Sequence, residues 1–354
     1  MIASIEEGQS MQQVVVERFG GTEELQLREV PTPTPRAGQV LVRLMSIGMN
    51  HADLMGRRGD YKLSTGDPPY TPGLEGGGVI EAVGEGVDTS RVGERVVLAP
   101  QVTRPQRGLG GTYRSHYVCG ADEPFVAPAG IPDDWLGALW LSHLTSWGCL
   151  MWKHNRQGVL INGPRDQVVG LPAASSSVAL AAAQVVRTAG GTSIGLTTSE
   201  AKVADIREVY DHVVVTHDAD GQMKPWHRDL KRLTEGRGVD IFFDPVAAGD
   251  YLNTEIRCLA QRGVIYVYGL LGKTGPVDVT PLIRKHARIE GYVNDELFAA
   301  GDAETMQGCS AVLDLFSAGR YTQRIGQVFP LADVREAHEA MQRGTHVGKM
   351  VLVP

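Results

Sequence analysis

The pattern of hydrophobic and polar positions divides the chain into two parts of different character. Between Gln12 and about Pro132, short β-branched runs alternate with clusters of glycine and proline, as in VVVERF, QVLVRLMSIG, GGGVIEAVG and ERVVLAP. Short runs of this kind, bounded by turn residues, are typical of β-strands. The first part is therefore predicted to be a compact, partly barrel-shaped β domain.

From about Pro164 onward, strand-like runs alternate with helical stretches. VVGLP precedes SVALAAAQVVRTAG, TSIGLTT precedes SEAKVADIREV, and HVVVT, VDIFFD and GVIYVYG follow with helical segments between them. Strand and helix repeated in this way predict a parallel, doubly wound sheet. Ligands of such sheets bind at the carboxyl ends of the strands, beside the point where the strand order reverses. After Gly291, further helical stretches and the run GKMVLV are compatible with either part.

Length, charge and cysteine content narrow the class of protein. The chain has 354 residues, about twice the length of a typical domain. Its net charge of −7 comes without a basic block, so nucleic acid and anionic membranes are poor candidates as partners. No apolar run approaches the roughly 20 residues that cross a bilayer. The four scattered cysteines and the short acidic segment 1–10 favour a cytoplasmic protein with a flexible extension before Met11.

The turn after VVGLP carries only small residues before the next helix begins. Ala173 and Ala174 are followed by Ser175, Ser176 and Ser177, and then by Val178. Backbone amides at a helix N-terminus, with serine hydroxyls beside them, can bind a pyrophosphate. Because the usual glycine fingerprint is absent, the alternative is that the serines only cap the helix. The position within a run of βα units favours dinucleotide binding.

The end of the second strand of this part bears on which nucleotide binds. NAD-dependent enzymes usually carry Asp or Glu there, whereas this chain has Thr197 and Thr198, with Lys202 one turn into the next helix. A carboxylate about 4 Å from a 2′-phosphate would cost on the order of 4 kcal/mol at an effective dielectric constant of 20. We therefore expect NADPH. Glu200 keeps NADH as an alternative, and Lys202 taken alone is equally compatible with a solvated helix lysine.

Taken together, these segments resemble the medium-chain dehydrogenase/reductase superfamily, and within it the quinone oxidoreductase branch that lacks zinc. The landmarks are GMNHADLMGRRGDY, PYTPGLEGGGVIEAVGEGV, LTSWG, PAASSSVALAAAQ, FDPVAAGDYL, VYGLLG and VGKMVLVP. The resemblance covers nearly the whole chain from Met11. It implies a GroES-like β-rich catalytic domain formed by residues 11–135 and 292–354, and a Rossmann cofactor domain formed by residues 136–291. It also implies a homodimer joined through the last cofactor-domain strands, such as IEGYV.

The same resemblance predicts that catalytic zinc is absent. Zinc alcohol dehydrogenases of the superfamily carry a metal-binding Cys where this chain has Asn50, and a metal-binding His where it has Leu74. Asn and Leu cannot replace a thiolate and an imidazole around Zn²⁺. The structural lobe with four cysteines is missing as well. His51 and His143 are expected to be structural or to contact phosphate.

Without a metal, hydrogen bonds must polarise the carbonyl group while binding brings substrate and nicotinamide together. The resemblance implies reduction of a quinone or an α,β-unsaturated carbonyl compound, with Asn50 near the nicotinamide ribose and Tyr61 donating a hydrogen bond or proton to the product. A cap for Asn50 and an aromatic wall for Tyr61 are the alternatives. Asp53 is taken as structural.

Further cofactor contacts are implied by the same resemblance. They are Thr145 in LTSWG, Tyr268 and Gly269 in VYGLLG, and Lys349 in VGKMVL. Each also has an ordinary structural interpretation, as a helix residue, a turn or a surface lysine. The segment 152–167 is longer than usual in the family, which weakens analogy for the substrate. A reductase of enoyl thioesters and a non-catalytic NADPH-binding sensor or crystallin-like protein remain the competing readings.

Overall fold

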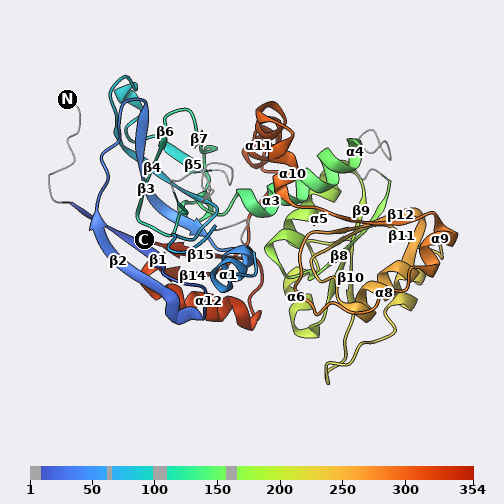
Figure 1. The fold of residues 1–354 in the computed structure, drawn as a ribbon. Helices are drawn as coiled ribbons and strands as arrows, with labels where there is room; N and C mark the ends of the chain where they lie inside the picture. The colour runs from blue at the N-terminus through green and yellow to red at the C-terminus, as the bar shows by residue number, and fades with distance from the viewer. Residues whose placement is uncertain (1–8, 62–65, 99–109, 157–165) are drawn as a thin grey trace. The chain divides into compact units, whose positions relative to one another are not determined.

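The computed structural model describes residues 9–61, 66–98, 110–156 and 166–354 (Figure 1). The chain divides into two compact units, one formed by Met1–Leu141 with Leu313–Pro354 and the other by Ser142–Val312. The sequence analysis instead predicted domain boundaries between residues 135 and 136 and between residues 291 and 292. Residues after 291 group with the second unit because Tyr292 continues its sheet edge, donating its backbone N–H to Val267 at 2.9 Å.

The first unit is rich in β-structure. Its strands are β1 (Ser10–Val16), β2 (Leu25–Pro31), β3 (Gln39–Gly48), β4 (Gly76–Val83), β5 (Arg95–Leu98), β6 (His116–Gly120), β7 (Phe125–Val126), β14 (Ile325–Pro330) and β15 (Lys349–Val353). Its helices are α1 (His51–Arg58), α2 (Asp133–Leu136) and α12 (Val334–Arg343), with three-residue 3₁₀ helices at Thr22–Glu24, Thr89–Arg91 and Leu331–Asp333.

The two ends of the chain meet in the main sheet of the first unit. Its strand order is β14-β15-β3-β4-β5-β7, with β6 also paired to β3. Strand β15 from the C-terminal end lies antiparallel to β3, with Val351 opposite Gly48. Apolar residues from β1, β3, β4, β5, β15 and α12 share one buried core. The predicted β-rich first part is confirmed.

Close backbone packing explains the triple glycine of this unit. A Cβ atom on Gly78 of β4 would lie 1.9 Å from the carbonyl oxygen of Arg43 on β3. Real Cβ atoms do not approach a backbone oxygen so closely, so a side chain here would force β3 and β4 apart. The run GLEGGG therefore brings β4 tightly against β3, directly after Glu75.

The second unit alternates strands and helices. Its strands are β8 (Val168–Pro172), β9 (Thr192–Thr197), β10 (His212–Val215), β11 (Val239–Asp244), β12 (Leu259–Val267) and β13 (Arg288–Gly291). Its helical elements are α3 (Trp140–Trp147), a π-helix (Gly148–Lys153), α4 (His154–Arg156), α5 (Ser177–Ala189), a 3₁₀ helix (Glu200–Lys202), α6 (Val203–Ile206), α7 (His227–Leu233), α8 (Gly249–Cys258), α9 (Thr280–Lys285), α10 (Asn294–Ala299) and α11 (Asp302–Ser317). Helix α3 begins, and α11 ends, within the first unit.

The six strands of the second unit form a parallel sheet in the order β10-β9-β8-β11-β12-β13. This is the doubly wound order 3-2-1-4-5-6, in which the chain reverses direction across the sheet between β8 and β11. The loops after these two strands therefore flank the expected ligand crevice. The predicted parallel, doubly wound sheet is confirmed.

Gly170, which interrupts the apolar run of β8, has a packing role at this switch point. A Cβ atom on Gly170 would lie 2.5 Å from ring atoms of Phe242 on β11. Phe242 is fully buried in the core of the unit. The missing side chain thus leaves room for a large aromatic ring beside the two strands that flank the crevice.

Two local predictions differ from the structure. The stretch SEAKVADIREV forms only a 3₁₀ turn and the four-residue α6, rather than one helix. Within the β-like first part, His51–Arg58 forms α1, which the strand pattern did not indicate.

Over the described residues, no helix has both the length and the apolar character needed to cross a membrane. None of the four cysteines forms a disulfide.

Candidate functional site

Two hydrogen bonds between Asn50 and Asp53 fix the start of helix α1. The Asn50 backbone is extended, with φ −135° and ψ 152°. Its N–H donates to Oδ2 of Asp53 at 2.8 Å, and the N–H of Asp53 donates to the Asn50 carbonyl at 2.9 Å. A carboxylate in the first turn satisfies an amide that the helix itself cannot. Asp53 therefore sets where α1 starts and holds Asn50 at its N-terminus.

The side chain of Asn50 is bound on both sides by buried partners. Its Nδ2 donates to the Gly48 carbonyl and to Oε1 of Glu75, both at 3.2 Å. Its Oδ1 accepts from Nζ of Lys349 at 2.5 Å. An amide nitrogen has two hydrogens, so both donors of Asn50 are used inside the first unit. Only acceptor capacity on Oδ1 remains.

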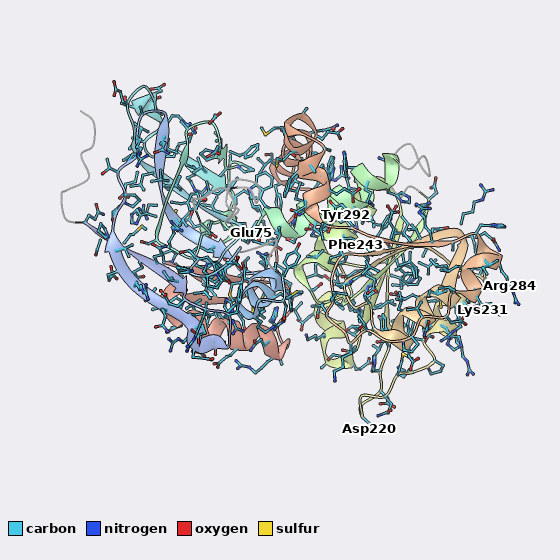
Figure 2. The ribbon with its side chains drawn as sticks, in the orientation of Figure 1. Glu75, Asp220, Lys231, Phe243, Arg284 and Tyr292 are labelled. Atoms are coloured by element: carbon cyan, nitrogen blue, oxygen red, sulfur yellow. The ribbon has the colours of Figure 1, made fainter. Side chains whose placement is uncertain are left out.

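Glu75 is the centre of this cluster and is fully buried, inside the first unit (Figure 2). Its Oε1 accepts from Lys349 at 2.5 Å, and its Oε2 accepts from the backbone amides of Trp140 and Leu141 at 3.0 and 2.8 Å. Lys349 is 1% exposed. Three separate segments of the chain thus meet at one carboxylate, and Lys349 is neither a surface lysine nor open to a ligand from solvent.

Asp53 also takes part in a second set of buried hydrogen bonds, which includes Tyr113 and His338. The Tyr113 hydroxyl donates to Oδ2 of Asp53 at 3.4 Å and lies 3.3 Å from Nε2 of His338 on α12. Burial raises the pKa of Asp53 to about 7, opposed by the amide of Asn50 and the charge of Lys349. Burial also lowers the pKa of His338 to about 3. Burial therefore favours the neutral form of both the Asp53 carboxyl group and the His338 imidazole.

The residues around Asn50 do not fit a zinc ion. The ammonium group of Lys349 already contacts Asn50 and Glu75, so a cation occupies the neighbourhood of the expected ligand position. Leu74, at the other ligand position, is a buried apolar residue. Within the described parts of the chain, no cluster of three or more His, Cys, Asp or Glu side chains is arranged to hold a metal.

In the second unit, the loop after β8 turns sharply into α5. Ala173 lies in the left-handed region with φ +52°, and the Ser176 amide donates to its carbonyl at 2.8 Å. Ser176 is the N-cap of α5, and its hydroxyl accepts from the Ala179 amide at 3.3 Å. Ser177 and Val178 form the first turn, whose amides have no intrahelical acceptor. The capping role and an anion-binding role are therefore compatible.

Lys202 joins the ends of two neighbouring strands. Its Nζ donates to the hydroxyl of Ser175 at 3.3 Å, although the two residues follow β9 and β8 respectively. Thr197 is buried and accepts the Ser199 amide at 3.2 Å, whereas Thr198 is exposed. Burial lowers the pKa of Lys202. The structure thus brings a lysine and a serine together at the place where a nucleotide phosphate is expected.

Tyr268 brings a third strand end to the same loop. Its ring stacks on Phe243 with centroids 4.0 Å apart, and its hydroxyl shares a hydrogen bond with Ser176. Gly269 lies against the loop after β11, where an added Cβ would be 3.1 Å from the Pro245 carbonyl oxygen. Ser175, Ser176, Lys202 and Tyr268 therefore form one cluster at the carboxyl edge of the sheet.

Thr145 lies on α3 and is held by a polar chain. Its Oγ1 accepts from Nδ2 of Asn294 at 2.9 Å, and Oδ1 of Asn294 accepts from the Tyr292 hydroxyl at 3.0 Å. The neighbouring Ser146 donates to the carbonyl of Val178 at 3.1 Å. This bond connects α3, one residue after Thr145, to the first turn of α5.

Tyr61 lies beyond the end of α1 that is opposite Asn50. Helix α1 has eight residues, so its ends are about 12 Å apart. Tyr61 is half-buried, and residues 62–65, which follow it, lie outside the described residues, as does most of the long segment 152–167. The roles predicted for Asn50 and Tyr61 toward substrate stay predictions.

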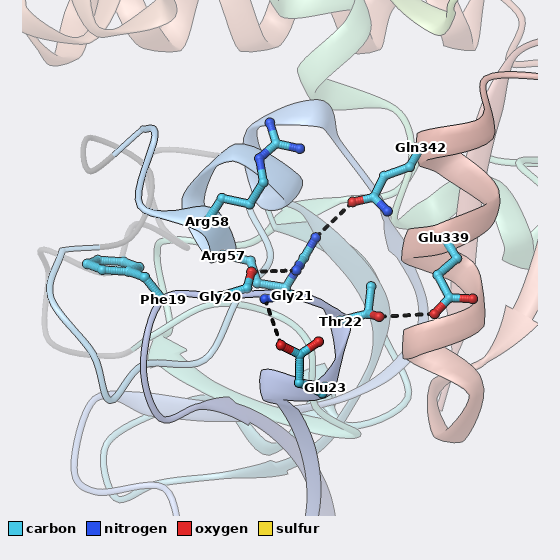
Figure 3. A pocket seen from close by; sticks show the side chains of 9 residues that line it. All are labelled: Phe19, Gly20, Gly21, Thr22, Glu23, Arg57, Arg58, Glu339 and Gln342. Atoms are coloured by element: carbon cyan, nitrogen blue, oxygen red, sulfur yellow. Dashed lines mark hydrogen bonds between the residues drawn. The ribbon is translucent and has the colours of Figure 1, made fainter.

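A cavity of about 530 Å³ lies near the C-terminal end of α1 (Figure 3). Arg57 crosses it, donating to the Gly20 carbonyl at 2.6 Å and to Oε1 of Gln342 at 2.9 Å. None of the predicted site residues lines it. The cavity is therefore separate from the cluster around Asn50.

The sequence did not single out Glu75, Tyr113 or His338. A glutamate inside the glycine-rich run GLEGGG, in an otherwise apolar region, was the available signal for Glu75. Tyr113 and His338 are distant in sequence from Asp53 and carry no local pattern that links them to it.

Comparison with known proteins gives two family matches. The alcohol dehydrogenase GroES-like domain matches residues 36–131, and the zinc-binding dehydrogenase family matches residues 210–352. The human synaptic vesicle membrane protein VAT-1 homolog is 28% identical, over 96% of this chain and 86% of its own. A quinone oxidoreductase of Lama guanicoe is 29% identical over 97% of each chain. The crystal structure of Escherichia coli quinone oxidoreductase complexed with NADPH has the same fold, with a TM-score of 0.80 and 24% identity over 97% of this chain and 100% of that one.

Replacement of Lys349 by methionine tests the buried cluster. The change leaves the Glu75 carboxylate buried without its cation, which we expect to cost about 3 kcal/mol of unfolding free energy. The double variant Lys349→Met/Glu75→Gln should recover part of that loss, because the charge is removed with its partner. Urea unfolding of the four proteins in the cycle measures this, and purely additive losses would contradict it.

Proposed function

The chain belongs to the medium-chain dehydrogenase/reductase superfamily, in its quinone oxidoreductase-like branch, and we propose that it transfers hydride from NADPH to a quinone or α,β-unsaturated carbonyl compound without zinc. The observation that carries the proposal is the hydrogen bond between Lys202 and Ser175 beside the N-terminus of α5. A cation and free helix amides at one place suit a nucleotide with an additional phosphate.

The second unit supplies the residues that would hold the nucleotide. The first-turn amides of Ser177 and Val178, with the hydroxyls of Ser175 and Ser176, would bind the pyrophosphate. Lys202, with Thr197 and Thr198, would bind the 2′-phosphate, and no carboxylate follows β9 before Glu200. Thr145, Tyr268 and Gly269 would orient the nicotinamide. When bound, NADPH supplies the hydride.

The first unit would contribute a rigid support for the substrate. Both Asn50 donors are used by Gly48 and Glu75, so Asn50 would act toward a ribose or substrate hydroxyl as an acceptor, through Oδ1. The buried Lys349 would keep that oxygen in place rather than touch the cofactor. Tyr61, the half-buried phenol, would donate the hydrogen bond or proton to the product.

The local chemistry also supports activity without zinc. One matching family is described as zinc-binding, but the ligand positions hold the amide of Asn50 and the apolar Leu74. Lys349 places a positive charge beside Asn50. Hydrogen-bond polarisation of the carbonyl group is the remaining electrophilic device, and conjugated carbonyls and quinones accept hydride under such conditions.

The direct test is NADPH oxidation followed at 340 nm with quinones and enones of increasing size, in the presence and absence of a strong chelator. We expect turnover that the chelator does not change. Loss of activity with the chelator would overturn the zinc-free mechanism. Tight NADPH binding without turnover on any substrate, enoyl thioesters included, would favour a non-catalytic nucleotide-binding protein.

Substitution of Lys202 by alanine tests the assignment of the cofactor. The variant should raise the KM for NADPH about tenfold, equivalent to roughly 1.4 kcal/mol, and leave the KM for NADH nearly unchanged. Lys231→Ala, at an exposed lysine on α7 (Figure 2), is the matched control. Equal effects of Lys202→Ala on both nucleotides would rule out the proposed contact with the 2′-phosphate.

We also propose that the protein is a homodimer formed through the edge of the parallel sheet. Among the described strands, β13 pairs only with β12. The preceding segment exposes large apolar side chains, among them Leu270 at 57%, Val279 at 57% and Ile283 at 73%. An open strand edge beside exposed apolar side chains is unfavourable in water and suits pairing with a second copy.

Sedimentation of Ile283→Glu tests this dimer. A charge at Ile283, the most exposed apolar side chain of this segment, should convert the dimer to a monomer, whereas Val126→Glu, at an exposed valine of the first unit, should leave it a dimer. A wild-type monomer at micromolar concentration would contradict the proposal.

A further inference from the structure

The loop after β11 is held by one buried carboxylate. Asp244, at the end of β11, is fully buried. Its Oδ1 accepts from the Val246 amide at 2.6 Å and its Oδ2 from the Ala247 amide at 2.8 Å. Ala247 is held in the left-handed region at φ +47°, which is unfavourable for a residue with a side chain. The bonds from Asp244 compensate for this conformation.

The same loop carries the backbone of the predicted nicotinamide contact. The Tyr268 amide donates to the Asp244 carbonyl at 2.9 Å, and the Leu271 amide donates to the Pro245 carbonyl at 2.8 Å. Gly272 donates to the Val246 carbonyl at 2.9 Å. These hydrogen bonds tie the backbone of residues 268–272 to the loop after β11. Any movement of the loop would therefore move Tyr268 and Gly269.

A second carboxyl group, that of Glu255 on α8, is also fully buried. Neither of its carboxyl oxygens has a hydrogen-bond donor among the described residues, and the nearby carboxyl group of Asp244, together with burial, raises the pKa of Glu255 well above its usual value. An ionised carboxylate in such a place would be strongly disfavoured. Two buried carboxyl groups close to each other can avoid facing each other as two anions by holding one proton between them.

The proton belongs on Glu255. Burial raises the pKa of Asp244 as well, but the two backbone amides that Asp244 accepts favour its ionised form, whereas Glu255 accepts none. Three other titratable groups interact with the pair, and burial raises the pKa of each, so all three are neutral in this environment: Tyr251, Cys258 and Tyr268. Burial and the charge of Asp244 raise the pKa of Glu255 well above its usual value.

On the basis of the proposed function, we propose that Glu255 is a positioning residue for the nicotinamide end of the cofactor site. As a neutral acid it donates a hydrogen bond to Asp244. Asp244, as a carboxylate, then fixes the loop 245–248, and the loop fixes the backbone of Tyr268 and Gly269. Glu255 itself touches neither cofactor nor substrate.

The proposal predicts the direction of a pH effect. The folded state retains a proton on Glu255 that the unfolded chain loses near its ordinary pKa. The stability that depends on this proton is therefore present at acidic pH and is lost as pH rises through the raised pKa of the folded state. Above that pH two carboxylates face each other, and the loop and the nicotinamide contact loosen together.

The experiment compares wild type with Glu255→Gln and Glu255→Leu between pH 6 and 10. Glutamine keeps a donor toward Asp244 but does not ionise, and leucine removes the donor. Glu208→Gln, the same substitution at an exposed site of this unit, is the control. The readouts are thermal unfolding and the Kd values for NADPH and for 2′,5′-ADP, which has no nicotinamide half.

We expect wild-type affinity for NADPH to fall as pH rises through the raised pKa of Glu255, and Glu255→Gln to remove that fall. Glu255→Leu should weaken NADPH about tenfold at neutral pH through loss of a charge-assisted hydrogen bond, and should leave 2′,5′-ADP almost unchanged. Equal weakening of both ligands would mean a general structural role, and an alkaline fall that persists in Glu255→Gln would place the proton elsewhere. Either result overturns the inference.

Failure of the proposed function gives a different pattern. A wild-type protein that binds neither ligand would refute NADPH binding, and with it the positioning role. The shared proton is then tested by unfolding alone, where Glu255→Gln should lose the alkaline decline in melting temperature that wild type and Glu208→Gln both show. An unchanged decline would refute the shared proton as well.

Discussion

The buried pair of Lys349 and Glu75 is the interaction on which the first unit depends. The two residues are 274 positions apart in the sequence, and neither charge is exposed to solvent. Burial of opposite charges is tolerated only when each finds its full set of partners. Here the backbone amides of Trp140 and Leu141 and the side chain of Asn50 complete the set. The pair joins the C-terminal strand β15 to the N-terminal sheet and, through Asn50, to the start of α1.

In the second unit, polar groups must be paired at the carboxyl edge of the sheet. Strands β8, β9, β11 and β12 all end there, and each end brings polar groups that the loops must satisfy. The Lys202–Ser175 and Tyr268–Ser176 contacts cross between strand ends, while Asp244 holds the loop after β11 internally. A nucleotide-binding edge built in this way has its cation, its hydroxyls and its helix amides in place before any ligand arrives, which reduces the entropic cost of binding.

Both units use protonation states that ordinary reference values do not anticipate. Burial raises the pKa of Asp53 to about 7, and the buried carboxyl group of Glu255 has no hydrogen-bond donor among the described residues. In each case the acid supports a residue proposed to act in the reaction, Asn50 in one unit and the Tyr268 backbone in the other. Because burial raises the pKa of both acids, the geometry of both sites depends on pH.

The sequence by itself determined the architecture and predicted the edge of the sheet at which the cofactor would bind. Short β-branched runs bounded by glycine and proline, the βα alternation and the small residues before α5 are local patterns, and local patterns follow directly from backbone geometry and side-chain size. They predicted the β-rich first part, the parallel sheet, the serine loop, and the candidate residues Thr197 and Lys202. Tertiary structure alone decided that Lys202 meets Ser175, that Lys349 is buried on Glu75, that Asn50 has no donor to spare, and that Glu255 is buried without a hydrogen-bond donor among the described residues. The physical reason is that burial and charge pairing arise between residues far apart in the chain, so no periodicity or spacing within one segment encodes them.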